Sequence, residues 1–178
     1  MERSEELTAR LAANRFRIAR AEFASALARL LGRAAPEPIA DAAQAVALSN
    51  DFRAAYDAAE PYDWAMVTRA WGAAEAPAVV EALYRLSRNV GMRPTWLLAR
   101  EGEPQAVALA SSSVLDNPLG FAAAAGHELV LLDREVPAGL WLVRHSYHNG
   151  PHVRFTWELE VFGEPWLSAA TRALRGIG

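Results

Sequence analysis

The amino-acid sequence predicts an α+β fold, with helices in its first half and a small antiparallel sheet in its second half. Two patterns support this prediction. Before Gly91, apolar residues recur at the three- to four-residue spacing of helices. After Gly91, apolar and polar residues alternate over short runs separated by turn residues. We expect a helical subdomain over residues 1–91 and a sheet subdomain over residues 92–178, packed as one compact unit.

The first expected element is a long helix over residues 4–31, which Gly32 can end. Its apolar residues form two stripes on opposite sides of the helix at 100° per residue. The smaller stripe holds Leu7, Leu11 and Ile18, and the larger holds Phe16, Phe23, Leu27 and Leu30. A helix with a single core face shows one stripe. Either the helix breaks near Ala19, or it is buried on two sides, or a partner binds one of the stripes.

The remaining elements follow from caps, breakers and periodicity. Helices are expected over residues 39–48, 52–59, 64–71 and 78–90, the last with a single clean apolar stripe. About five strands are expected, over residues 95–100, 105–111, 128–133, 139–148 and 152–162. One short helix is inserted over residues 116–126, and a C-terminal helix covers residues 166–175.

The amino-acid composition excludes several kinds of catalytic and metal-binding site. Hydrophobic residues make up 52% and charged residues 22% of the 178 residues, which is typical of a globular domain. The absence of cysteine excludes disulfides, thiolate nucleophiles and cysteine-ligated metals. All basic residues are arginine, which excludes a lysine Schiff base and a Walker A loop. Arginine without lysine is typical of a GC-rich genome, and we expect a bacterial, cytoplasmic protein with no cofactor.

The charge is unevenly distributed. The chain carries a net charge of −3, which argues against general nucleic-acid binding. Residues 1–33 hold seven arginines and four glutamates, so this segment is basic and the remainder is acidic. A basic helix on an acidic body docks against that body or against an acidic partner. No apolar stretch reaches the ~18 residues that cross a bilayer, and we expect no membrane contact.

The pairing register of the expected hairpin at residues 139–162 can be predicted from its apolar residues. A three-residue loop pairs His148 with His152 and aligns Val143 with Trp157, so that the apolar sets match on one buried face. His145 then points to the core side. The polar face carries the candidate ligand-binding residues Arg144, His148, His152 and Arg154.

Metal binding is one reading of this hairpin. Two cross-strand imidazoles about 5 Å apart can bind zinc or iron when a carboxylate completes the site. Glu158 lies about three pairs further along the ladder, roughly 20 Å away, so a solvated loop end is preferred and no metal is expected. His127-Glu128 begins a zincin motif but lacks the second histidine.

Two further groups of residues contain side chains of catalytic types. Ser111–Ser113 with His127 and Asp133 contain the residue types of a triad, but no nucleophile-elbow motif accompanies them. Glu158 and Glu160, about 7 Å apart on one strand face, match the carboxylate pair of glycoside chemistry. A polar strand end and a solvated strand face explain both patterns better.

The sequence therefore favours a non-catalytic accessory protein that binds a protein or peptide, or itself. In outline, helices in front of a small antiparallel sheet resemble bacterial immunity proteins and chaperones. The partner-binding candidates are Leu7, Leu11 and Ile18 with the neighbouring Arg3, Arg10 and Arg17, which recur every seven residues. Arginine at the rim of an apolar patch is common at interfaces. The alternative is a small enzyme or small-molecule-binding domain that uses His127 or His145 in a pocket between sheet and helices.

Overall fold

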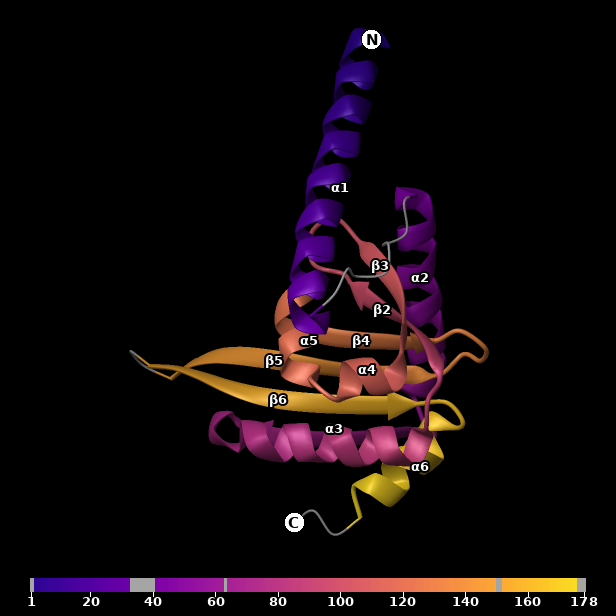
Figure 1. The fold of residues 1–178 in the computed structure, drawn as a ribbon, viewed down its shortest axis with the longest axis vertical. Helices are drawn as coiled ribbons and strands as arrows, with labels where there is room; N and C mark the ends of the chain where they lie inside the picture. The colour runs from indigo at the N-terminus through magenta and orange to yellow at the C-terminus, as the bar shows by residue number, and fades with distance from the viewer. Residues whose placement is uncertain (1, 33–40, 63, 150–151, 176–178) are drawn as a thin grey trace.

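The computed structural model describes residues 2–175 except residues 33–40, 63 and 150–151. Its fold is α+β, as the sequence predicts, with helices dominating the first half and an antiparallel sheet the second (Figure 1). The helices are α1 (Glu2–Leu31), α2 (Ala42–Ala59), α3 (Ala76–Val90), α4 (Ser111–Leu115), α5 (Pro118–Ala124) and α6 (Trp166–Ala173). A single 3₁₀ turn, η1 (Ala73–Glu75), precedes α3.

The described part of the sheet has six strands, and every neighbouring pair is antiparallel. Their order is β1-β6-β5-β4-β2-β3. The strands are β1 (Met66–Gly72), β2 (Pro94–Ala99), β3 (Gln105–Ala110), β4 (Glu128–Asp133), β5 (Gly139–Asn149) and β6 (His152–Phe162). The two longest strands, β5 and β6, form a hairpin that extends past β4 and β1.

Both faces of the sheet are covered. The larger core lies on the side of α3–α6 and the second half of α1, where Leu83, Leu97, Leu131 and Trp166 are fully buried. The smaller core lies under α2, where Phe52 packs against Val130 and Phe162. Because each face is buried, the central strands carry apolar residues at consecutive positions, as in Leu129–Leu132 of β4.

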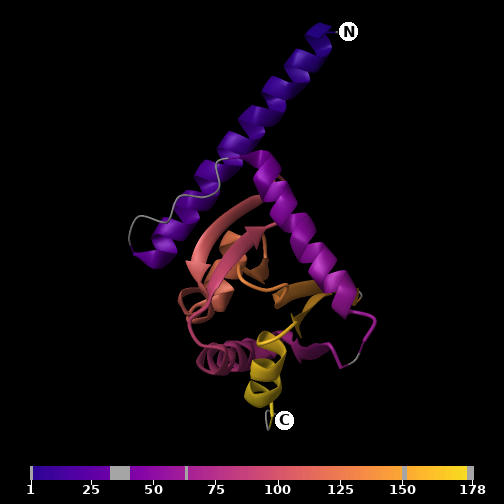
Figure 2. The same cartoon turned by 90° about the vertical axis from the view of Figure 1, so that its right-hand side faces the viewer.

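Helix α1 stands partly outside this layered body. In both Figure 1 and Figure 2 its N-terminal half extends beyond every other element, while its C-terminal half lies beside the sheet. The helix runs without interruption from Glu2 to Leu31. The alternative in which a break near Ala19 turns both stripes onto one core does not occur, because Leu7, Leu11 and Ile18 are exposed while the opposite stripe is buried.

Two elements of the first half differ from expectation. Residues 64–71 were expected to be helical, but Met66–Gly72 form strand β1 along β6, which raises the strand count to six. This edge strand gains its backbone partners only from β6, nearly 90 residues later, so local sequence does not specify it. The helices expected over residues 39–48 and 52–59 form one helix, because the polar residues at 49–51 do not interrupt α2.

The hairpin register also differs by one residue. Asn149 pairs with His152 and His148 with Val153, so His148 and His152 are not a cross-strand pair. Val143 lies opposite Glu158, on the face of α2. The predicted register assumes that only one face of the hairpin is buried. Because α2 buries the second face as well, matching the apolar residues of the two strands does not determine the register. The loop residues 150–151 and the side chains of His148 and His152 lie outside the described residues.

Among the described residues, no helix combines the length and apolar character needed to cross a membrane.

Candidate functional site

The outward-facing side of α1 carries a line of exposed aliphatic side chains, here called the α1 outer stripe: Leu7, Leu11 and Ile18. Their exposed fractions are 59%, 55% and 44%. They follow one another at intervals of four and seven residues, which places them on one side of the helix. Asn14 occupies the position between Leu11 and Ile18 on that side and is also exposed. The aliphatic line is thus interrupted once, by the polar side chain of Asn14.

The opposite side of α1 anchors the helix. Phe23 and Leu27 are buried in the larger core, and Phe16 is 9% exposed. Every residue from position 5 to position 11 is exposed, so contact with the body begins about one turn later. At this level Arg15 pairs with Glu103 of the β2–β3 turn, 3.1 Å away. The anchored half therefore leaves residues 5–11 clear of the body.

Arginines border the α1 outer stripe. Arg10 is exposed and pairs with Glu6 one turn earlier at 2.6 Å. Arg17 donates to the side-chain oxygen of Asn14 at 2.9 Å. Arg3 occupies the same side by its seven-residue spacing, although its side chain lies outside the described residues. The predicted partner-binding residues are thus brought onto adjacent sides of a single helix.

The predicted ligand-binding residues of the hairpin are not gathered in this way. Arg144 lies on the face of the larger core, with its guanidinium 4.7 Å from the ring centre of Phe155 and 5.9 Å from that of Trp157. Arg154 lies opposite Tyr147 in the hairpin and is therefore on the other face of the sheet. The expectation that the two arginines share one polar face is wrong, as a consequence of the one-residue register shift.

The expected position of His145 in the core is also wrong. Its side chain is exposed on the face of α2, and its Nε2 lies 2.8 Å from Oε2 of Glu158. On the same face, Glu160 accepts a hydrogen bond from the hydroxyl of Tyr56 at 2.9 Å. Burial raises the pKa of Glu160, and the charge of Glu158 adds to this effect, while the Tyr56 hydrogen bond opposes it. The two glutamates each have a structural partner.

Sequence reasoning missed the partners that α2 brings to this face. Tyr56 reaches the sheet from α2, and Trp141 donates to Glu128 at 2.9 Å. The guanidinium of Arg100 lies 5.2 Å from the ring centres of both Phe52 and Trp141. The Tyr56–Glu160 and Arg100–Phe52 contacts join segments far apart in the chain, and no local spacing signals them.

The residues of the suspected triad have separate structural roles. Ser111 donates to the carbonyl of Gly91 and accepts from the amide of Arg93, both at 3.0 Å. Asp133 binds the guanidinium of Arg93. His127 precedes β4, whereas Asp133 ends it, so the two are separated by a six-residue strand, roughly 20 Å. A hydrogen-bonded triad is therefore excluded by the length of β4.

A cavity of about 620 Å³ lies where the anchored half of α1 meets α5 and the β2–β3 turn. Small residues, Phe23 and Leu30 line it together with Glu22, Glu101 and Arg29. Gln105, only 2% exposed, also lines it, and its side-chain oxygen has no hydrogen-bond partner in the described part of the chain. No histidine is among the described residues that line this cavity.

Comparisons with protein-family models, curated proteins and solved structures find no match to this chain.

Proposed function

We propose that this protein is a non-catalytic accessory protein that binds another protein, and that the α1 outer stripe is the surface that the partner covers. The observation that carries the proposal is the exposure of Leu7, Leu11 and Ile18 along one side of a helix that projects from the body. Aliphatic anchors spaced in this way are the usual means by which one helix recognises another or a groove.

The energetics favour an occupied stripe. Fully burying an aliphatic side chain of this size contributes about 1.5–3 kcal/mol. Single exposed apolar residues are common on protein surfaces and need no partner. Leu7, Leu11 and Ile18 lie in line on the side of α1 opposite its buried side, so one partner helix can bury all three together. Because the stripe lies on a helix that is already formed, less conformational entropy is lost when a partner binds.

The proposal is tested with the double variant Leu7→Asp, Leu11→Asp. Its matched control is Ala9→Asp, Ala13→Asp, which places the same charges, also four residues apart, at exposed positions on the other side of the same helix. Proteins from the native host that bind the unaltered protein are identified, purified and titrated against all three proteins. We expect the stripe variant to keep its helix content and to lose at least tenfold in affinity, while the control binds normally.

Equal affinity of the stripe variant and the unaltered protein would refute the proposal. The solution mass of each protein, measured in the same series, separates binding of another protein from self-association. A dimer that only the stripe variant dissociates would identify a second copy as the partner.

A second candidate, small-molecule binding, is favoured by the cavity beside α5. The buried oxygen of Gln105 lacks a donor among the described residues, and leaving such a group unpaired costs about 1–3 kcal/mol. In the structure this oxygen has no exposed surface, so the Gln105 side chain would have to turn into the cavity before a ligand N–H or O–H group could pair with it. Native mass spectrometry of the purified protein and of Gln105→Leu tests this candidate: a bound mass that is lost in the variant supports it, and an unliganded mass in both opposes it.

A further inference from the structure

We infer that the partner of the α1 outer stripe is a helix of a different protein, whose apolar side is bordered by glutamate or aspartate. This inference rests on the proposed function and adds the charge of the partner. It comes from the side chains that flank the stripe.

Between Leu7 and Ile18 the borders of the stripe carry arginines and no carboxylate. At 100° per residue, Arg10 and Arg17 lie on one border, and position 3 continues that row. Arg15 lies on the other border, and its side chain remains 68% exposed beside Glu103. Glu5 and Glu6 lie on the half of the helix that faces away from the stripe, and Glu6 pairs with Arg10 at 2.6 Å. A helix that covers the stripe therefore meets guanidinium groups on both sides.

In coiled coils, the residues that flank the apolar seam determine which helices pair, and Arg10, Arg15 and Arg17 occupy the equivalent positions beside the stripe. Residues flanking the apolar seam face each other across the interface, and opposite charges there favour pairing while like charges oppose it. Arginine is well suited to this place, because its stem covers apolar surface and its planar head binds carboxylates through two donors. Carboxylates bordering the partner's apolar side would thus pair with Arg10, Arg15 and Arg17.

A second copy of this chain is a poor occupant for the same reason. In a parallel pair, Arg10 of one helix would lie beside Arg15 of the other. In an antiparallel pair with Leu7 opposite Ile18, Arg10 would lie beside Arg17 of the other helix. Each contact would occur twice by symmetry, so both orientations bring arginines together. The charge of the borders selects a different, acidic helix.

The test uses two designed helical peptides of four heptads with leucine at the apolar seam positions. One peptide has glutamate at all flanking positions and the other has lysine, and the binding of each to the full-length protein is measured by fluorescence anisotropy. We expect the protein to bind the glutamate peptide at least tenfold more tightly, with a preference that shrinks as salt is added. In Arg10→Glu, Arg17→Glu, the preference should reverse toward the lysine peptide.

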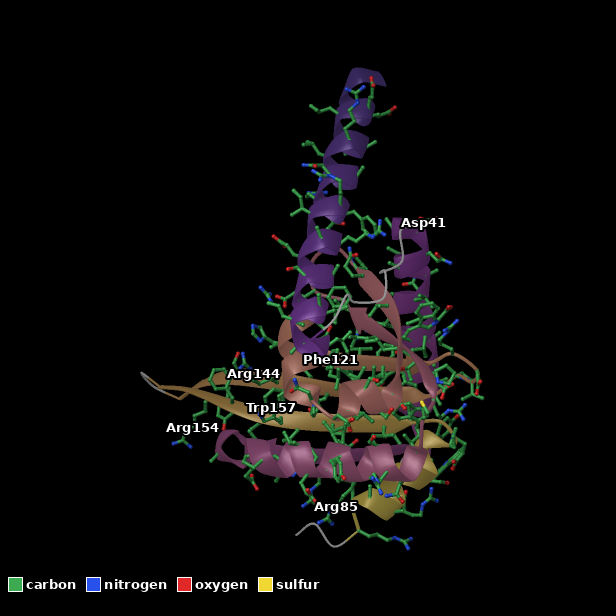
Figure 3. All side chains as sticks on the ribbon, in the orientation of Figure 1. Asp41, Arg85, Phe121, Arg144, Arg154 and Trp157 are labelled. Atoms are coloured by element: carbon green, nitrogen blue, oxygen red, sulfur yellow. The ribbon has the colours of Figure 1, made fainter. Side chains whose placement is uncertain are left out.

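The matched control is Arg85→Glu, Arg88→Glu, which changes the net charge equally on α3, far from the stripe (Figure 3). It should keep the preference for glutamate. Equal binding of the two peptides, a preference for lysine, or binding of neither overturns the acidic partner. If both bind equally and Leu7→Asp, Leu11→Asp abolishes both, the stripe remains the binding surface and only the inferred charge of the partner is wrong.

Discussion

Replacing Asp133 by asparagine is the sharpest test of how the body is held together. The carboxylate of Asp133 ends β4 with no exposed surface. It accepts hydrogen bonds from the guanidinium of Arg93, from the indole of Trp166 at 2.8 Å and from the amide of Glu135 at 2.9 Å. It therefore ties the start of β2 and the start of α6 to the end of β4. The exchange to asparagine removes the charge with little change of shape.

The expected cost follows from the partners that remain. Breaking a buried ion pair typically costs 3–5 kcal/mol. Arg93 is 21% exposed and keeps its second carboxylate, Glu135, at 2.9 Å, so the cost should fall toward the lower end. We expect Asp133→Asn to lower the free energy of unfolding by about 2–4 kcal/mol and the melting temperature by roughly 10 °C. Urea unfolding at pH 7 measures the first quantity. Glu135→Gln, at an exposed position, should change stability by less than about 1 kcal/mol.

The pH dependence of the stability difference between the unaltered protein and Asp133→Asn tests the same role of the carboxylate a second way. Burial acts to raise the pKa of Asp133, but hydrogen bonds from Arg93, Trp166 and the Glu135 amide outweigh it, and the pKa is lowered. A carboxyl group with a lowered folded-state pKa contributes stability that is complete above its unfolded pKa and is lost as the pH falls through the folded value. The difference between the two proteins should therefore be largest at neutral pH and shrink in acid. Equal stability at pH 7, or a difference that does not shrink in acid, would refute the role of this carboxylate.

Three further predictions concern particular positions. Gly139→Ala should destabilise the protein by about 3 kcal/mol or more in urea unfolding, because a Cβ there would lie 2.0 Å from a backbone oxygen of β4; unchanged stability would contradict the close strand approach. Tyr56→Phe should raise the pKa of Glu160 further in a carbon-13 carboxyl titration, since it removes a hydrogen bond that lowers it; a lower pKa would show that the bond does not form. Leu27→Ala should cost about 2–5 kcal/mol while Leu7→Ala costs almost nothing, and equal costs would place the stripe in the core.

Much of the fold could be predicted from local patterns, because those patterns record which side of an element is buried. The single stripe of α3 and the turn residues around the β2–β3 hairpin specify their elements within the chain segment itself. The two opposed stripes of α1 could also be read correctly, although the choice between a bend and a free face needed the structure. Only the three-dimensional placement shows that Leu11 is 55% exposed, on the side of α1 opposite the buried Phe23 and Leu27.

The errors share one physical cause, which is burial by a distant element. β1 is a strand because β6 pairs with it, although its local sequence allows a helix. The hairpin register was misassigned because α2 covers the second face of the sheet, so that residues on both faces of β5 are apolar. Tyr56 of the same helix donates a hydrogen bond to Glu160 and packs edge-on against the ring of Trp141. Sequence periodicity reports that a residue is buried, but it does not report which element buries it.

The central claim, that a partner protein covers the α1 outer stripe, is tested most directly by hydrogen exchange of the protein alone and in complex with a partner identified from its host. The free half of α1 makes few contacts with the body and should exchange quickly when the protein is alone. The account predicts that binding slows exchange over residues 5–18 and leaves the sheet and α3 unchanged. Protection confined to the sheet, α2 or the β5–β6 hairpin, with residues 5–18 exchanging as before, would contradict it.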